Sequence, residues 1–170
     1  MKIMVLSDTH GNRNAVLNII KNIDEQRPDA LVHLGDGAGD VNAIEKGAGM
    51  PVYAVSGNCD TFTAFPELLT PSFGGIKFML CHGHRYRVKS GLGILERAAE
   101  QLGCKAVLFG HTHVPVIQQR ENVLLLNPGA AGGFLGSYGL VKIHDTGQVS
   151  AEILSFDHEM RPRRGWLYGK

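Results

Sequence analysis

Short apolar runs recur through the first two thirds of the chain, and each run ends in glycine and polar residues. The runs occupy residues 3–6, 30–34, 52–55, 76–81 and 106–109. Near-continuous apolar runs bounded by glycine are typical of strands that are buried on both faces. They predict a sheet that is covered by helices.

Helical spacing separates several of these runs. Apolar residues follow the i, i+3, i+4, i+7 pattern over residues 16–23 and again over 94–102. Pro28 helps to end the first helix before the second strand, and Gly103 is placed as a C-cap of the other helix. Strand and helix therefore alternate in this part of the chain.

The last third of the chain has a different pattern, which is typical of antiparallel hairpins. Residues 116–119 and 123–126 flank one turn, and 140–143 and 150–154 flank another. A turn at Gly74 and Gly75 joins residues 68–70 to 76–80. The pattern predicts an α/β fold of a single domain over residues 1–170, with sheets packed between helices and a basic C-terminal extension at 157–170.

Charge and length limit the classes of function. The chain of 170 residues has 17 Lys and Arg against 16 Asp and Glu, so its net charge is +1. This balance creates no strong field, so neither nucleic acid nor an anionic membrane is expected as the main partner. Function is therefore expected in a local site that binds a small molecule. Homo-oligomers are compatible with the sequence, which does not reveal the oligomeric state.

The spacing of the cysteines and the length of the N-terminal apolar run indicate where in the cell the protein is located. Cys59, Cys81 and Cys104 form neither a CxxC pair nor an even set of disulfides, which suits a reducing environment. The N-terminal apolar run meets Ser7 and Asp8 at once, so it is too short for a signal peptide or a membrane span. We expect a cytoplasmic protein.

Potential metal ligands follow each of the predicted buried strands. In open α/β sheets, ligands bind outside the carboxyl ends of the strands, so these side chains are expected to converge on one crevice. The candidates are Asp8, His10, Asp36, Asn58, His82, His111 and His113.

Local spacing supports the same site. Residues i and i+2 of an extended segment face the same way, so Asp8 with His10, and His111 with His113, can each present two ligands to one side. Seven candidates are too many for one tetrahedral ion and suit two ions with open positions. The two oxygens of Asp36 make it the natural bridge.

The ligand chemistry points to hydrolysis of phosphate esters. Mixed His, Asp and Asn ligands favour Mn²⁺, Fe²⁺, Co²⁺, Ni²⁺ or Zn²⁺ over Ca²⁺. Two such cations lower the pKa of a bridging water, which can attack phosphorus as hydroxide, and neutralise the charge on the phosphoryl oxygens. No protein nucleophile is then needed. The chain also lacks the GxxxxGK[ST] loop of P-loop NTPases.

These motifs resemble the calcineurin-like metallophosphoesterase superfamily in order and spacing, over residues 1 to about 130. The segment from Gly57 to Asp60 and the chain length are similar to the small bacterial and archaeal phosphodiesterase branch, which is related to the retromer subunit of the same fold. The resemblance implies a metallo-dependent phosphatase-like fold, a four-layer αββα sandwich, often used with manganese or nickel. It also implies one ion at Asp8, His10, Asp36 and His113, and a second at Asp36, Asn58, His82 and His111.

Two positions depart from the family pattern. Many members have His after the motif's Asn, where this chain has Cys59, and a thiol with a pKa of about 8.5 is a poorer general acid than imidazolium. The departure predicts a preference for esters with good leaving groups, such as aryl phosphodiesters. Ala130 replaces the Ser that often follows the segment 127–129, so a hydroxyl contact there is not expected.

The remaining histidines and cysteines receive weaker interpretations. His33, His144 and His158 are expected to bind no metal, and Cys81 and Cys104 are expected to be small buried apolar residues. His84 either contacts the phosphate from outside the ligand set or is a simple loop residue. The candidate catalytic residues are Asp36, Asn58, Cys59 and His84.

Three other functions compete with the phosphodiesterase hypothesis. They are a phosphomonoesterase, a protein-binding scaffold of the same fold with a degraded site, and a purely structural metal site. All seven candidate positions keep liganding side chains, which favours an enzyme over a scaffold. Structural metal sites are usually closed and tetrahedral, unlike a set of ligands on glycine-rich loops.

Overall fold

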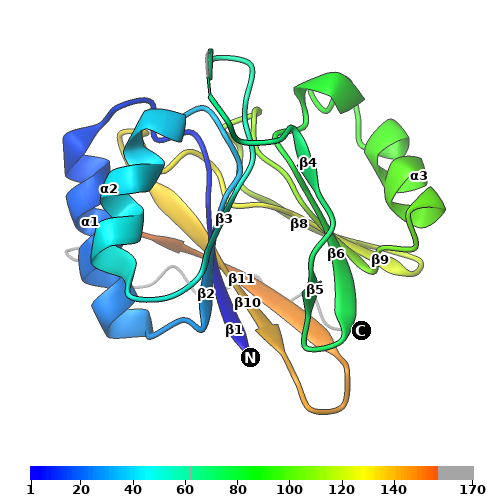
Figure 1. Cartoon of the computed structure of the whole chain (residues 1–170). Coiled ribbons are helices and arrows are strands. Elements are labelled where there is room, and N and C mark those ends of the chain that lie inside the picture. Colours follow the sequence, from blue (N-terminus) through cyan, green and yellow to red (C-terminus); the bar gives the residue numbers. More distant parts are fainter. Residues whose placement is uncertain (62, 157–170) are drawn as a thin grey trace.

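The computed structural model describes residues 1–61 and 63–156, and it places two β-sheets face to face between helices. Figure 1 shows α1 (Arg13–Gln26) and α2 (Ala38–Ala48) on the outer face of one sheet and α3 (Gly93–Gln101) on the outer face of the other. The predicted four-layer αββα sandwich is therefore confirmed.

The first sheet combines parallel and antiparallel strands in the order β11-β10-β1-β2-β3. Strands β1, β2 and β3 run parallel, with β3 at one edge, and β10 and β11 pair antiparallel on the other side of β1. The strand bounds are Lys2–Leu6 for β1, Ala30–His33 for β2, Val52–Ala54 for β3, Ser137–Ile143 for β10 and Val149–Ser155 for β11.

The second sheet has the order β4-β6-β7-β9-β8, with β5 also paired to β6. Strands β6, β7 and β9 run parallel, while β4, β5 and β8 are antiparallel to their neighbours. The bounds are Leu68–Leu69 for β4, Ser72–Phe73 for β5, Ile76–Cys81 for β6, Ala106–Leu108 for β7, Val116–Arg120 for β8 and Val123–Asn127 for β9.

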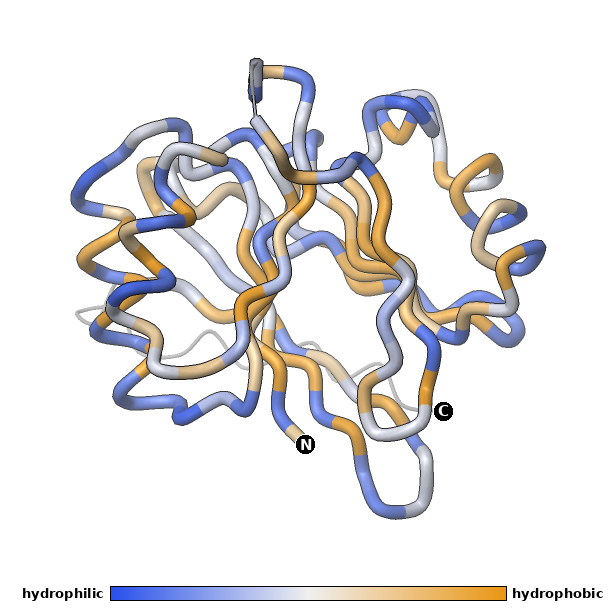
Figure 2. Tube along the Cα trace, in the orientation of Figure 1, coloured by the Kyte–Doolittle hydropathy of each residue, from blue (hydrophilic) through white to orange (hydrophobic). Residues whose placement is uncertain are grey.

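Apolar side chains form three layers, because the strands bury both of their faces. In β1, Ile3 and Val5 pack between the sheets, whereas Met4 and Leu6 pack under α1 and α2. The third layer joins β6 and β7 to α3. Figure 2 shows the apolar colour along the central strands and the polar colour on the outer loops and helix faces. Cys81 and Cys104 belong to the third layer, as the sequence predicted.

Helix boundaries follow local capping chemistry. The Asn12 side chain accepts hydrogen bonds from the backbone N–H groups of Asn14 and Ala15 at the start of α1. At its end, Arg27 adopts a left-handed conformation directly before Pro28. Helix α2 was not predicted, because its apolar stripe is limited to residues such as Val41 and Ile44 and it contains internal glycines.

The predicted hairpins are present, with one refinement. Leu69 pairs with Leu80 as expected, but Pro71 follows β4, and the chain continues as a separate short strand that pairs Ser72 with Lys77. Proline interrupts the ladder because it has no N–H to donate. The predicted C-terminal extension at 157–170 lies outside the described residues.

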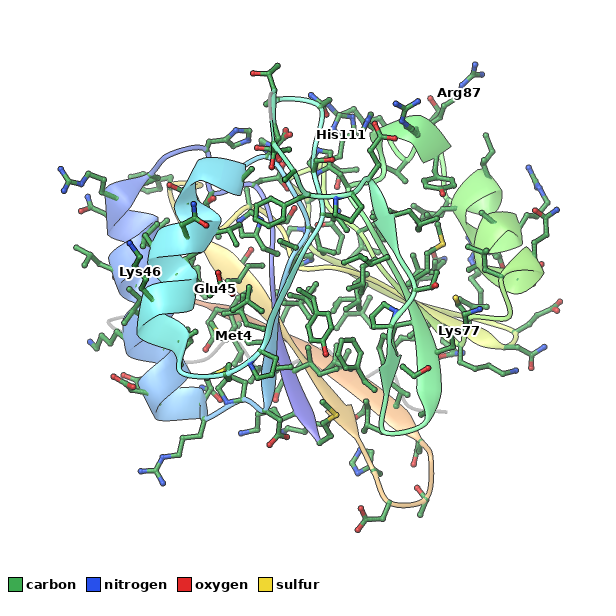
Figure 3. All side chains as sticks on the ribbon, viewed as in Figure 1. Met4, Glu45, Lys46, Lys77, Arg87 and His111 are labelled. Atoms are coloured by element: carbon green, nitrogen blue, oxygen red, sulfur yellow. The ribbon has the colours of Figure 1, made fainter. Side chains whose placement is uncertain are left out.

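The carboxyl ends of the parallel strands in both sheets lie at one end of the molecule. In Figure 3, His111 lies at this end, and Lys77, at the start of β6, lies well away from it. The topology thus brings the loops after β1, β2, β3, β6 and β7 together. None of the helices in the described part of the chain has the length and hydropathy that a membrane crossing requires.

Candidate metal centre

The first group of predicted ligands, which we call the exposed cluster, consists of Asp8, His10 and His113. Each residue offers a ligand atom within 4.8 Å of the others. Asp8 Oδ1 lies 3.0 Å from His113 Nε2 and 3.7 Å from His10 Nε2, and the two imidazole Nε2 atoms are 3.3 Å apart. Both imidazoles are accessible, with 39% and 50% of the side chains of His10 and His113 exposed.

Asp8 is held from one side only. Its Oδ2 accepts hydrogen bonds from the Ser7 hydroxyl at 2.5 Å and from the His111 backbone N–H at 3.2 Å. Its Oδ1 is buried and has no hydrogen-bond partner among the described residues. A buried carboxylate oxygen without a donor is costly, so this oxygen is suited to a cation.

The second group, which we call the buried cluster, consists of Asp36, His82 and His111. Their ligand atoms also lie within 4.8 Å of one another. His82 Nδ1 lies 2.8 Å from the backbone carbonyl oxygen of Leu34, which can only accept, so Nδ1 carries the hydrogen. In the neutral ring, Nε2 then presents a lone pair toward Asp36 Oδ2 at 3.3 Å.

This arrangement fits a metal ion. Two acceptor atoms that face each other at 3.3 Å repel unless a cation lies nearby, and His82 Nε2 is buried without a hydrogen-bond partner in the described structure. Metal-binding histidines characteristically donate their other N–H to a carbonyl or carboxylate, as His82 does to Leu34.

Asp36 connects the two clusters. Its carboxylate also groups with His10 of the exposed cluster and with the Cys59 thiol. The Cys59 backbone N–H donates to Asp36 Oδ1 at 2.8 Å, so the segment that contains Asn58 is anchored to this carboxylate. Asn58 is exposed, and its amide donates to Cys59 Sγ at 3.4 Å.

The backbone is strained at the predicted ligands. Among the described non-glycine residues, few have a positive φ, and five of the predicted ligands are among them: Asp8, His10, Asp36, His111 and His113, with φ between 49° and 71°. This left-handed region costs free energy for residues other than glycine. Strain concentrated at side chains that converge indicates a functional constraint.

Two glycines allow the loops to approach each other. A Cβ atom at Gly57 would lie 2.1 Å from Asp36 Oδ1, and a Cβ atom at Gly110 would lie 1.9 Å from the Ser7 hydroxyl. Neither contact is possible, so both positions require glycine for steric reasons. Gly57 therefore lets two loops of the first sheet approach each other, and Gly110 lets a loop of the second sheet approach the loop after β1.

Asp60 positions the buried cluster, and sequence reasoning assigned it no role. Its carboxylate accepts backbone hydrogen bonds from Asp36, Gly37, Ala38 and Gly57 at 2.7 to 2.9 Å. Burial acts to raise the pKa of Asp60, but the four N–H donors outweigh it and hold the pKa below its usual value. The available signal was an Asp two residues after a candidate ligand in a glycine-rich loop.

Asn127 and His33 also support the ligand loops. Asn127 is buried, and its amide donates to the Gly110 carbonyl at 2.7 Å and to the Thr112 hydroxyl at 3.1 Å. His33 lies in β2 with Nε2 3.1 Å from the Thr9 hydroxyl, and its Nδ1 accepts from the Gly35 N–H at 3.3 Å. Burial lowers the pKa of His33 to about 4, so the ring is neutral.

The remaining histidines differ in their relation to the clusters. His84 lies in a 3₁₀ turn (His84–Tyr86), with its ring centroid 5.5 Å from that of His82 and its Nδ1 buried without a partner in the described residues. Burial and the neighbouring His82 lower the pKa of His84. His144 is remote in a hairpin, where it contacts the Ser150 hydroxyl. His158 lies outside the described residues.

The sequence matches known proteins over most of its length. The profile of the Calcineurin-like phosphoesterase superfamily domain matches residues 1–146. The probable metallophosphoesterase YsnB of Bacillus subtilis (strain 168) is 31% identical over 132 residues, which cover 76% of this chain and 75% of that protein. Phosphodiesterase MJ0936 of Methanocaldococcus jannaschii is 26% identical over 161 residues, covering 86% and 93% of the two chains.

Solved structures share the fold. A predicted phosphoesterase from Streptococcus pneumoniae TIGR4 superposes with a TM-score of 0.79 at 28% identity, covering 96% of this chain and 94% of that one. Vps29 of Entamoeba histolytica, solved with Zn²⁺, has a TM-score of 0.75 at 22% identity and covers 92% of this chain and 100% of its own. The match over residues 1–146 shows that the chain belongs to the calcineurin-like phosphoesterase superfamily.

Proposed function

We propose that the chain is a phosphodiesterase that uses two divalent metal ions. One ion is held by Asp8, His10, Asp36 and His113, and the other by Asp36, Asn58, His82 and His111. The observation that carries the proposal is the pair of ligand clusters joined at Asp36, each with a buried ligand atom that makes no hydrogen bond to the residues that the structure describes.

The proposed ions supply an acidified water as nucleophile and positive charge for the phosphoryl oxygens. The ligand residues set the net charge of the site. Asp8 and Asp36 contribute two negative charges, and the other proposed ligands are neutral histidines and an amide, so a site with two divalent cations stays positive. A phosphodiester monoanion is attracted to such a site.

The expected preference for good leaving groups rests on Cys59, the residue that follows the proposed ligand Asn58. The hydrogen bond to Asp36, followed by partial burial, raises the pKa of Cys59, so this residue is a protonated thiol near neutral pH. A thiol is a weak general acid compared with imidazolium. We therefore infer that esters with good leaving groups, above all aryl phosphodiesters, are hydrolysed fastest, and that phosphomonoesters are the second candidate class.

The proposed metal is Mn²⁺, with Ni²⁺, Co²⁺, Fe²⁺ and Zn²⁺ as alternatives. The proposed ligands are imidazole, carboxylate and amide groups and include no thiolate, and such a set suits these ions. A cytoplasmic location is proposed because all three cysteines are free, which matches a reducing compartment. Metal analysis of protein purified from its native host without added metal would identify the ion.

A protein-binding scaffold is the rival function. The fold likeness to Vps29 favours it, and the complete set of liganding side chains opposes it.

The test is Mn²⁺-dependent hydrolysis of bis(4-nitrophenyl) phosphate by the wild-type chain and by Asp36→Asn and Asn58→Ala. Asp145→Asn, in the exposed β10–β11 turn, is the matched control for loss of a carboxylate. We expect hydrolysis by the wild type and the control, and loss in both site variants. Undiminished hydrolysis in Asp36→Asn and Asn58→Ala would refute the metal assignment, and no hydrolysis by the wild type would favour the scaffold.

A further inference from the structure

A groove of about 400 Å³ lies beside the loop that carries His111 and His113, and neither cluster uses it. Its wall is mostly apolar, with Lys89 as the charged residue that lines it. The apolar lining residues are Val88, Leu92, Phe109, Val114 and Val116.

The groove shares two segments of the chain with the metal centre. Thr112, which lines the groove, stands between His111 and His113 in sequence, and Val88 and Lys89 follow shortly after His82 and His84. Figure 3 shows His111 and Arg87, one residue from each segment, at the same end of the molecule. A ligand at the metal centre is therefore next to the groove.

The side of the groove nearest the ligands is held in place. The Thr112 hydroxyl accepts hydrogen bonds from the Asn127 amide at 3.1 Å and from the Val114 backbone N–H at 3.2 Å. Val114 is nevertheless 57% exposed, among the most exposed large apolar residues of the described chain. Because Val114 also lines the groove, its exposed side chain adds apolar surface that a ligand in the groove can contact.

The charge of the groove matches that of a phosphodiester. Lys89 lines the same groove as Thr112, the sequence neighbour of His111, so its positive charge lies at the wall of the groove. A cation at this position can attract the single negative charge of a diester whose substituent enters the groove.

We propose that this groove binds an aromatic substituent of the phosphodiester substrate, with Val114 contacting the ring and Lys89 attracting the phosphate. The proposal rests on the proposed function, since it assigns the substrate's organic group at the same site. It restricts the substrate class to diesters with at least one aryl or similarly flat, apolar substituent, as opposed to diesters of small alkyl alcohols.

Binding of symmetrical diesters tests the proposal without depending on which substituent leaves. The Mn²⁺-loaded protein is titrated calorimetrically with diphenyl phosphate and with dimethyl phosphate. We expect diphenyl phosphate to bind at least about tenfold more tightly, because only its rings gain contact with the groove.

Three variants identify the residues responsible. Val114→Asn is expected to weaken diphenyl phosphate about fivefold, whereas Val114→Leu keeps the apolar contact and the wild-type preference. Lys89→Gln is expected to weaken both diesters by a similar factor of about three, since it removes charge and no apolar surface. Leu17→Asn, on the exposed face of α1 and 65% exposed, is the matched control for a surface substitution.

Each outcome decides between the proposals. Equal binding of the two diesters by the wild type, or an aryl preference that Val114→Asn leaves intact, would overturn the groove assignment while hydrolysis of bis(4-nitrophenyl) phosphate still supports the proposed function. If the Mn²⁺-loaded protein binds neither diester and hydrolyses none, the phosphodiesterase proposal fails and takes the groove assignment with it. If Val114→Asn alone among the variants loses the preference for diphenyl phosphate over dimethyl phosphate, the result supports both the groove assignment and the proposed function.

Discussion

The two ligand clusters differ in how firmly the protein holds them. In the buried cluster, His82 has an unexposed side chain, and a backbone carbonyl holds its tautomer and orientation. In the exposed cluster, His10 and His113 are 39% and 50% exposed. The difference indicates that the buried cluster is organised in advance, whereas the exposed cluster is completed when a cation draws its ligands together.

The largest expected effect comes from removing one imidazole in each cluster. His82→Gln is expected to lower kcat/KM for bis(4-nitrophenyl) phosphate about a thousandfold, because it removes an organised ligand. His113→Gln is expected to lower it about thirtyfold and to recover with excess Mn²⁺, because solvent can replace an exposed ligand. Mn²⁺ titrations of both variants measure the contrast, and equal loss with equal recovery would remove the distinction between the clusters.

Loss of the Asp60 carboxylate is expected to disturb the buried cluster, because Asp60 holds the backbone of the loop that carries Asp36. Asp60→Asn replaces charge-assisted bonds to four backbone N–H groups and turns an amide donor toward some of them. We expect a loss of about 3 kcal/mol in the free energy of unfolding, measured by urea denaturation in the presence of EDTA. Asp145→Asn serves as the control, and a change below about 0.5 kcal/mol in Asp60→Asn would contradict the positioning role.

His33 links the loops of both clusters through Thr9 and Gly35, and its burial makes stability depend on pH. Its folded pKa of about 4 lies below the unfolded value of 6.5, so below pH 6.5 the unfolded chain binds a proton that the folded chain does not. The contribution that neutral His33 makes to the free energy of unfolding is fully present above pH 6.5. It falls by about 3 kcal/mol as the pH drops to about 4.

Metal-free protein is required for this measurement, because protons also release metal from histidines. His33→Gln removes the titration, so the difference in unfolding free energy between wild type and variant should shrink as the pH falls from 6.5 to 4. A constant difference over this range would show that His33 does not titrate as inferred.

The smallest effect is expected at Cys59, which borders both clusters without being a proposed ligand. Cys59→His is expected to speed hydrolysis of diesters with poor leaving groups about tenfold and to leave 4-nitrophenyl esters nearly unchanged, because an imidazolium can protonate the departing oxygen. A series of aryl esters with leaving groups of increasing pKa measures this. An unchanged slope of rate against leaving-group pKa would rule out an acid at this position.

Particular residues show how far sequence reasoning reached. The run 3–6 predicted a strand buried on both faces, and β1 is such a strand, because the apolar pattern itself records contact with two layers. Asp8, His10 and Asp36 were recognised because they follow such runs. Helix α2 was missed because its glycines and short apolar stripe carry little helical signal.

Supporting residues were harder to predict than ligands. Asp60, Asn127 and His33 each contact a loop that is distant in sequence: Asp60 accepts from Gly37, Asn127 donates to Gly110, and His33 contacts the Thr9 hydroxyl. Nothing in the local sequence records those partners. Val114 received no interpretation from the sequence, since it precedes the predicted strand at 116–119, and only the groove beside His111 gave it a role.

The sequence alone determined most of the strands, the helices α1 and α3, the burial of the first strand on both faces and the types of ligand, because periodicity and residue chemistry are local properties. The tertiary structure decided which ligands share a cluster, which imidazoles are exposed, which backbone groups Asp60 holds and where the groove lies. These depend on the distance between loops of two different sheets, and that distance is set by packing between the sheets.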